Sequence, residues 1–142
     1  FTEVATLGDG PVSLSDGNVT LTNATHSGRI LLVPDGGQDN TYTLPAPIAG
    51  SMFRFVYAGG AADATDALVV TPGNTNFYIG GVTFLDTDGN EVSSVFSNGS
   101  SNSSIQFNVP AGFDVTIMGL NTTNYQILGN VTSTTAPAFA DQ

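Results

Sequence analysis

Hydrophobic and polar side chains alternate along much of the chain. In Met52–Tyr57 (MFRFVY), Phe53, Phe55 and Tyr57 fall on one side of an extended chain and the intervening residues fall on the other. Asn18–Thr22 (NVTLT) alternates in the same way. A period of two indicates half-buried β-strands, and no stretch of eleven or more residues repeats hydrophobic positions at helical spacing. The pattern therefore predicts an all-β protein.

Turn-forming residues divide the chain into short strands. Pro34–Gly37, Asp88–Asn90 and Pro110–Gly112 supply the fixed or positive φ angles that turns require. The expected strands are 18–22, 30–33, 41–44, 52–57, 68–71, 77–79, 82–85, 91–96, 105–109, 115–119 and 125–131.

About ten short strands at this spacing are typical of a β-sandwich or a jelly roll. We expect one domain of antiparallel strands over residues 1–131 of the 142-residue chain. Residues 132–142 (TSTTAPAFADQ) read as an extended C-terminal tail, which either lies across a neighbouring subunit or frays.

The charge of the chain limits its partners. Arg29 and Arg54 are the only basic residues against twelve acidic ones, which gives a net charge of −10. Binding to nucleic acid or to an anionic membrane requires basic patches, so neither partner is expected. The hydrophobic runs are also far shorter than the ~20 residues of a transmembrane helix. With no Cys and only 10% charged residues, the surface must consist mainly of Thr, Ser, Asn and Gly, as suits an extracellular or virion protein.

The residues needed for common catalytic mechanisms are scarce. The only histidine, His26, stands next to Ser27, but neighbouring residues of a strand project to opposite faces and form no nucleophile–base pair. Paired carboxylates could hydrolyse glycosides. Glu3 and Glu91 are the only glutamates, however, and several aspartates precede glycine in turns, where Asp bonds nearby backbone amides. We therefore expect no enzymatic activity, no catalytic residues and no cofactor.

The segment Asp86–Glu91 (DTDGNE) has two interpretations. Three carboxylates and an amide within six residues resemble the oxygen ligands that Ca²⁺ prefers, but the spacing of an EF-hand is absent. Asp88-Gly89 between two strand patterns is also the preferred pair for a two-residue type I′ hairpin. We favour the hairpin and assign no metal site, which leaves calcium binding open.

Other polar and aromatic residues receive structural interpretations. Phe77 and Tyr78 follow a polar loop and could stack on sugars if exposed, but we expect them to face the core or a subunit interface. Arg29 and Arg54 each border or interrupt a hydrophobic strand, so each is expected to pair with a carboxylate. Six Asn-x-Ser/Thr sequons reflect the abundance of these residue types; they begin at Asn18, Asn23, Asn98, Asn102, Asn121 and Asn130.

Three segments resemble a known group of proteins. Asn23–Val33 (NATHSGRILLV), Tyr42–Gly50 (YTLPAPIAG) and Phe53–Tyr57 (FRFVY) are similar to virion structural proteins of tailed phages that infect marine bacteria. Those proteins run ATHAGR into a hydrophobic strand, followed by TLPA and FRFVV. The resemblance covers roughly residues 5 to 85, and its motifs are short.

The resemblance implies a capsid decoration or cement protein on the outer surface of the phage head. Its partners would be the major capsid protein and further copies of itself, as a trimer or dimer. Binding only to the assembled shell would stabilise that shell. The alternative is a receptor- or glycan-binding domain of a phage fibre or tail.

Overall fold

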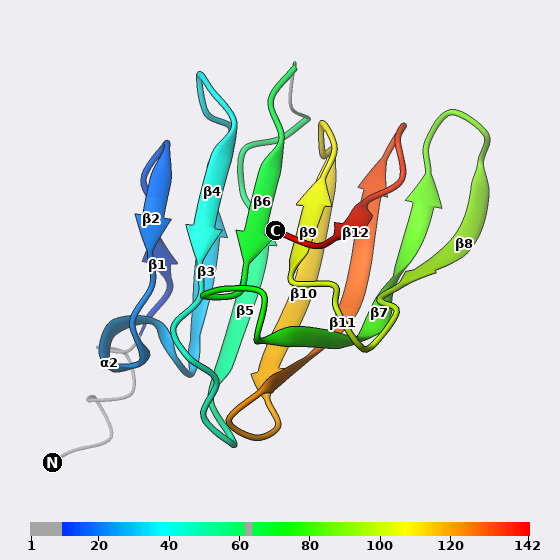
Figure 1. The fold of residues 1–142 in the computed structure, drawn as a ribbon. Helices are drawn as coiled ribbons and strands as arrows, with labels where there is room; N and C mark the ends of the chain where they lie inside the picture. The colour runs from blue at the N-terminus through cyan, green and yellow to red at the C-terminus, as the bar shows by residue number, and fades with distance from the viewer. Residues whose placement is uncertain (1–9, 62–63) are drawn as a thin grey trace, which may run out of the picture.

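Two β-sheets face each other in the computed structural model, which describes residues 10–61 and 64–142 (Figure 1). The seven-stranded sheet contains, in spatial order, β1 (Val12–Ser13), β3 (Arg29–Val33), β5 (Met52–Tyr57), β10 (Gly112–Gly119), β11 (Asn124–Ser133), β7 (Phe77–Asp86) and β8 (Glu91–Phe96). The five-stranded sheet contains β12 (Ala138–Ala140), β9 (Ser104–Phe107), β6 (Ala67–Val70), β4 (Asn40–Thr43) and β2 (Asn18–Thr20). A four-residue helix, α2 (Asn23–His26), joins β2 to β3. The expected all-β, sandwich-like single domain is confirmed.

The first half of the described chain alternates between the two sheets. Strands β1, β3 and β5 lie side by side and parallel in one sheet, while β2, β4 and β6 lie side by side and parallel in the other. After each strand the chain therefore crosses to the opposite sheet, forms one strand there, and returns to form the strand that pairs with the first. We call this part, residues 12–70, the wound half.

The second half contains two hairpins. Strand β7 pairs with β8, and β10 pairs with β11, in both cases antiparallel. Strand β11 also pairs with β7, but in parallel. Of the ten strand pairings in the described residues, five are parallel, so the expectation of antiparallel strands throughout is wrong. Four of these five lie in the wound half, where segments such as 34–39 lead the chain across to the other sheet and form no hairpin.

The core fills the space between the sheets. Alternation buries every second residue of β10, and it does the same in β5 and β11 except at Tyr57 and Gly129, which are partly buried. Aromatic rings contribute much of the packing: Phe107 of β9 stacks on Phe113 of β10 with ring centroids 4.3 Å apart. Burying each such side chain contributes roughly 1.5–3 kcal/mol of hydrophobic stabilisation.

Buried tyrosines also join the two layers by hydrogen bonds. The Tyr78 hydroxyl of β7 donates to the carbonyl oxygen of Val69 in β6, at 3.0 Å. The Tyr125 hydroxyl of β11 donates to the carbonyl oxygen of Pro45, at 2.8 Å. Burial raises the pKa of Tyr78 well above its ordinary value and that of Tyr125 to about 12, so both hydroxyls remain protonated donors. Tyr78 is thus a core residue, as expected.

The C-terminal segment belongs to the sandwich. Thr132 and Ser133 complete β11, and β12 pairs antiparallel with β9, where Phe139 lies opposite Ile105. The Phe139 ring meets Tyr78 edge-to-face, with centroids 6.1 Å apart. Residues 132–142 are therefore folded onto their own domain rather than forming the tail that we expected.

Candidate functional site

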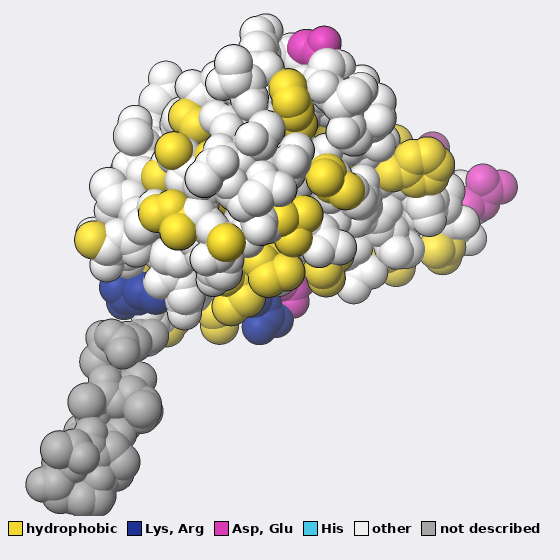
Figure 2. Space-filling view, turned by 60° about the horizontal axis from the view of Figure 1, so that its bottom comes forward, with side chains coloured by type: hydrophobic (Ala, Val, Ile, Leu, Met, Phe, Trp, Pro, Cys, Tyr) yellow, Lys and Arg dark blue, Asp and Glu magenta, His cyan; other side chains and the backbone are white. Residues whose placement is uncertain are grey.

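The outer face of the seven-stranded sheet combines exposed hydrophobic side chains with an ion pair. We define the outer face by Met52 and Arg54 of β5, Asp114 and Thr116 of β10, Leu128 and Asn130 of β11, and Gly81, Thr83, Ser94 and Phe96 of the β7–β8 hairpin. These residues alternate with the core residues of the same strands and therefore project away from the second sheet. In the view of Figure 2 most of the surface consists of neutral polar side chains and backbone atoms, with hydrophobic side chains scattered among them.

Arg54 and Asp114 form the ion pair of the outer face. The two residues are diagonal neighbours across the β5–β10 pairing, in which Arg54 lies opposite Thr116 and Val56 lies opposite Asp114. Arg54 donates from Nε to Asp114 Oδ1 at 2.9 Å and from Nη2 to Oδ2 at 2.6 Å. This two-point hydrogen bonding lowers the pKa of Asp114 and raises that of Arg54. The carboxylate partner expected for Arg54 is confirmed.

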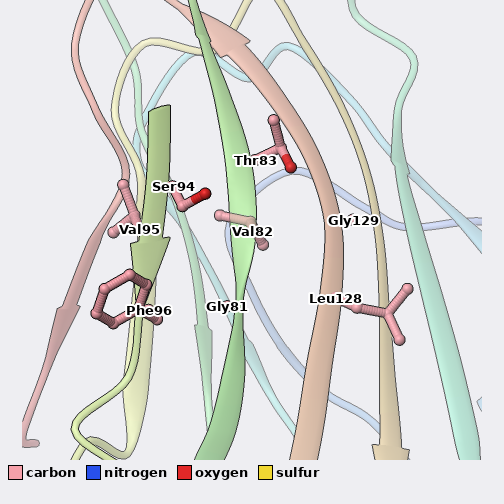
Figure 3. A pocket seen from close by; sticks show the side chains of 8 residues that line it. All are labelled: Gly81, Val82, Thr83, Ser94, Val95, Phe96, Leu128 and Gly129. Atoms are coloured by element: carbon pink, nitrogen blue, oxygen red, sulfur yellow. The ribbon is translucent and has the colours of Figure 1, made fainter. Parts of the chain in front are cut away.

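A hollow of about 330 Å³ lies over Gly81, across Leu128 from this pair. Figure 3 shows the side chains of Phe96 and Leu128 on either side of Gly81, with Thr83 further along β7 and Ser94 further along β8. A Cβ atom at Gly81 would lie 2.6 Å from the Cβ of Phe96, so glycine is needed where β8 passes this closely. The absence of a side chain at position 81 thus creates the floor of the hollow.

A second hollow, of about 350 Å³, lies on the other side of Leu128. Its lining includes Met52, Arg54, Asp114 and Thr116. Leu128 therefore forms a ridge between two shallow depressions, and 51% of its surface is exposed. A hydrophobic ridge between depressions with polar walls is a shape that a complementary protein surface can cover.

The residues considered for catalysis lie elsewhere. His26 is in α2, where its Nδ1 accepts a hydrogen bond from the Thr22 backbone N–H at 3.0 Å. The Ser27 hydroxyl accepts from the Met52 backbone N–H at 3.2 Å. His26 thus bonds the backbone at the N-cap of α2, and Ser27 bonds the backbone at the start of β5.

Arg29 differs from the expectation. Its Nε and Nη2 both donate to the carbonyl oxygen of Gly10, at 3.0 and 2.6 Å, and its Nη1 donates to Thr25 at 3.4 Å. The carboxylate partner that we expected is not found among residues 10–61 and 64–142. The position of Arg29 at the start of β3 explains the difference, because the carbonyl groups of Thr25 in α2 and of Gly10, which precedes β1, lie within its reach.

Several aspartates accept hydrogen bonds from backbone amides in loops. Asp16 accepts from the Gly37 N–H, Asp39 from the Asp66 N–H, and Asp66 from the Val109 N–H. Within the described residues, no three His, Cys, Asp or Glu side chains are grouped so that they could hold a metal ion. Glu3, Asp9 and Asp63 lie outside those residues.

The Asp86–Glu91 segment forms a hairpin, but not the expected two-residue type. Asp86 pairs with Glu91, which leaves a loop of four residues. The Asp86 carboxylate accepts from the N–H groups of Asp88 and Gly89, and Asn90 has a positive φ of 53°. The turn thus closes on Asp86, and Asn90 supplies the left-handed residue.

The sequon asparagines are mainly on the surface. Those at 18, 98, 121 and 130 are exposed, whereas Asn23 and Asn102 are partly buried. Asn102 donates to the Asp141 carboxylate at 3.2 Å and accepts from the Asn98 backbone N–H at 2.9 Å. Its amide is therefore engaged within the fold.

Sequence reasoning did not single out Leu128, Gly81 or Phe96. A signal was present at Leu128: Ile127 and Leu128 are adjacent hydrophobic residues, and in a strand such neighbours must project to opposite faces. One of the two had to be exposed.

No helix in the described ranges is long and hydrophobic enough to cross a membrane. No protein-family model, curated protein or solved structure matches the chain.

Proposed function

We propose that the chain is a capsid decoration or cement protein that binds the major capsid protein lattice on the outer surface of a tailed-phage head. The observation that carries the proposal is the outer face, where a hydrophobic ridge at Leu128 lies beside the Arg54–Asp114 pair. The residues sit on hydrogen-bonded strands, so the surface is preformed and loses little conformational freedom on docking. The motifs that resemble tailed-phage virion proteins supply the identity of the partner.

The mechanism is thermodynamic. A domain that binds the assembled lattice but not free capsid subunits stabilises the assembled state by mass action. Such a role needs a rigid, soluble domain with a docking surface and no catalytic residue. The net charge of −10 keeps unbound copies soluble.

The glycan-binding alternative would rest on exposed aromatic side chains. Tyr78, one of the two aromatics considered for it, is buried and cannot stack on a sugar. Copy number separates the two roles, because a decoration protein occupies the whole head lattice whereas a fibre domain is present only at the tail.

A binding assay tests the proposal. Phage heads from which the protein has been stripped are mixed with the purified chain, sedimented, and imaged by cryo-electron microscopy. We expect wild-type protein to co-sediment and to form β-sandwich density across the outer lattice. Leu128→Asp should lose at least about tenfold in affinity, since a carboxylate on the ridge would be desolvated without a partner.

The matched control is Thr20→Asp, which adds the same charge at an exposed position of the five-stranded sheet. It should bind like the wild type. Wild-type protein that stays in the supernatant, or density confined to the tail, would refute the proposal.

A further inference from the structure

Strand β8 is an edge of the seven-stranded sheet with one side left unpaired within the described residues. It pairs only with β7 on one side and ends the sheet on the other, within the ranges that the structure describes. Its sequence, EVSSVF, contains no Pro and no Lys, which natural proteins commonly place on edges to prevent pairing. Val92 and Phe96 are 70% and 71% exposed, the highest values among the exposed large hydrophobic residues.

The free backbone groups of β8 can be assigned from its register. The Ser97 N–H donates to the Gly80 carbonyl at 2.9 Å, and Phe96 then lies opposite Gly81 and Val95 opposite Val82. Hydrogen-bonded and non-bonded pairs alternate in an antiparallel ladder. The odd-numbered residues 91–97 therefore bond to β7, and the N–H and C=O groups of Val92, Ser94 and Phe96 point to the open edge.

We propose that β8 of a second copy of this chain pairs antiparallel with this edge around a two-fold axis at Ser94. In this register Ser94 lies opposite Ser94 of the second copy, and Val92 lies opposite its Phe96. Three pairs that each exchange two bonds give about six inter-chain hydrogen bonds. The result is one continuous sheet through two subunits, with an isologous interface.

Side-chain chemistry selects this register over its neighbours. Only the even-numbered residues of β8 have free N–H and C=O groups, so an even-numbered residue must lie opposite an even-numbered residue of the second copy. The register between the two strands can therefore shift only in steps that preserve this match. A slip in one direction places Val92 opposite Ser94, and a slip in the other places it opposite Asn98. Only the register centred on Ser94 sets both hydrophobic residues against each other, where such a cross-strand pair stabilises the sheet.

The distribution of charge permits two acidic chains to approach along β8. The acidic residues of this hairpin, Asp86, Asp88 and Glu91, lie at the end formed by the β7–β8 loop. At the other end, residues 97–101 (SNGSS) carry no charge, and one carboxylate, that of Asp141, lies nearby and accepts a hydrogen bond from Asn102. Antiparallel pairing brings the acidic loop of one copy beside residues 97–101 of the other, and Glu91 faces Ser97. The two acidic β7–β8 loops are thus kept apart despite the net charge of −10 on each chain.

This inference goes beyond the proposed role on a phage head and does not depend on it, because self-association can be measured on the purified chain alone. Sedimentation velocity of wild-type protein should show a concentration-dependent species with twice the 14.5 kDa mass of the chain. Ser94→Pro should leave a monomer at the same concentrations. Proline removes an N–H that serves only the open edge and costs no bond to β7.

Cross-linking tests the register. The chain contains no Cys, so Ser94→Cys introduces a single thiol. Hydrogen-bonded partners lie about 5.5 Å apart between Cα atoms, within the range that a disulfide spans. Mild oxidation should therefore convert Ser94→Cys into a covalent dimer. The control is Thr83→Cys, which lies opposite Ser94 on β7; the two copies of residue 83 would be roughly 15 Å apart, too far for a disulfide.

Circular dichroism establishes that each variant is folded before its sedimentation or disulfide formation is measured. A wild-type chain that sediments as a monomer at every concentration overturns the proposal. So does a dimer that Ser94→Pro leaves intact, or one in which Ser94→Cys forms no more disulfide than Thr83→Cys. A wild-type dimer together with selective Ser94→Cys cross-linking supports it, whatever the head-binding assay shows.

Discussion

The two faces of the seven-stranded sheet are built from the same strands but differ in what surrounds each side chain. On β11, Ile127 is 1% exposed beneath the second sheet, whereas its neighbour Leu128 is 51% exposed on the outer face. Both are branched aliphatic residues of equal size. The difference teaches that the role of a hydrophobic residue here follows from the face it occupies: one face supplies folding free energy, and the other remains available for a partner.

The largest expected effect comes from truncating these two neighbours. Ile127→Ala should lower the free energy of unfolding by about 2–5 kcal/mol, because it removes buried methyl groups and leaves a cavity. Leu128→Ala should change it by no more than about 0.5 kcal/mol, since the site is solvent-exposed. Urea denaturation of both variants measures the difference. Equal losses would show that the outer face is part of the folding core.

Buried hydroxyl groups allow a second, finer test of the core face. Tyr78→Phe should cost about 1–3 kcal/mol, because the buried carbonyl of Val69 loses its donor. Tyr42→Phe is the matched control. The Tyr42 hydroxyl is buried and has no hydrogen-bond partner among the described residues, so its removal should be neutral or slightly stabilising. The denaturation midpoints of the two variants measure the difference. Similar losses of stability in both would show that the hydrogen bond of Tyr78 does not stabilise the fold.

The smallest expected effect concerns the ion pair of the outer face. Arg54 lowers the pKa of Asp114 from its ordinary value of 3.8. Arg54→Met should therefore raise that pKa towards 3.8, as an NMR titration of the carboxyl group would show. Arg54→Lys, which keeps the charge but cannot donate the two parallel bonds, should give an intermediate value.

The same pair sets a weak dependence of stability on pH. Because the folded-state pKa of Asp114 is lowered, its contribution is fully present above the unfolded value and is lost as the pH falls through the folded one. Both side chains are nearly half exposed, so the effect on the unfolding midpoint should be slight. An Asp114 pKa that does not move in Arg54→Met would show that the hydrogen bonds are not formed in solution.

Some of this architecture was predictable from the sequence because it depends on local side-chain alternation. The faces of Met52–Tyr57 were assigned correctly: Phe53 and Phe55 are buried, whereas Met52 and Arg54 are exposed. The existence of the β7–β8 hairpin also followed from its turn residues. The length of its loop did not. The Asp86 side chain accepts hydrogen bonds from Asp88 and Gly89, so the loop has four residues instead of the two expected for an Asp-Gly turn.

Strand pairing in the wound half was not predictable from local patterns. Pro and Gly show where a strand ends, but they do not show whether the chain folds back beside that strand or crosses to another layer. The same limit applies to residues 132–142, whose strand β12 depends on the distant β9. The outer face could not be predicted for the same reason, because Leu128, Gly81 and Phe96 become neighbours only after β11, β7 and β8 have paired.

The wound half has a consequence for how quickly the protein can fold. None of its strands pairs with its neighbour in sequence. Strand β1 can pair only after β3 is in place, and β2 only after β4, and in each case the intervening chain crosses to the other sheet. Closing such loops costs chain entropy before any ladder is formed, and proteins dominated by non-local pairings fold in milliseconds to seconds. We expect the β7–β8 and β10–β11 hairpins to form first, and the wound half to complete the sandwich in the slow step.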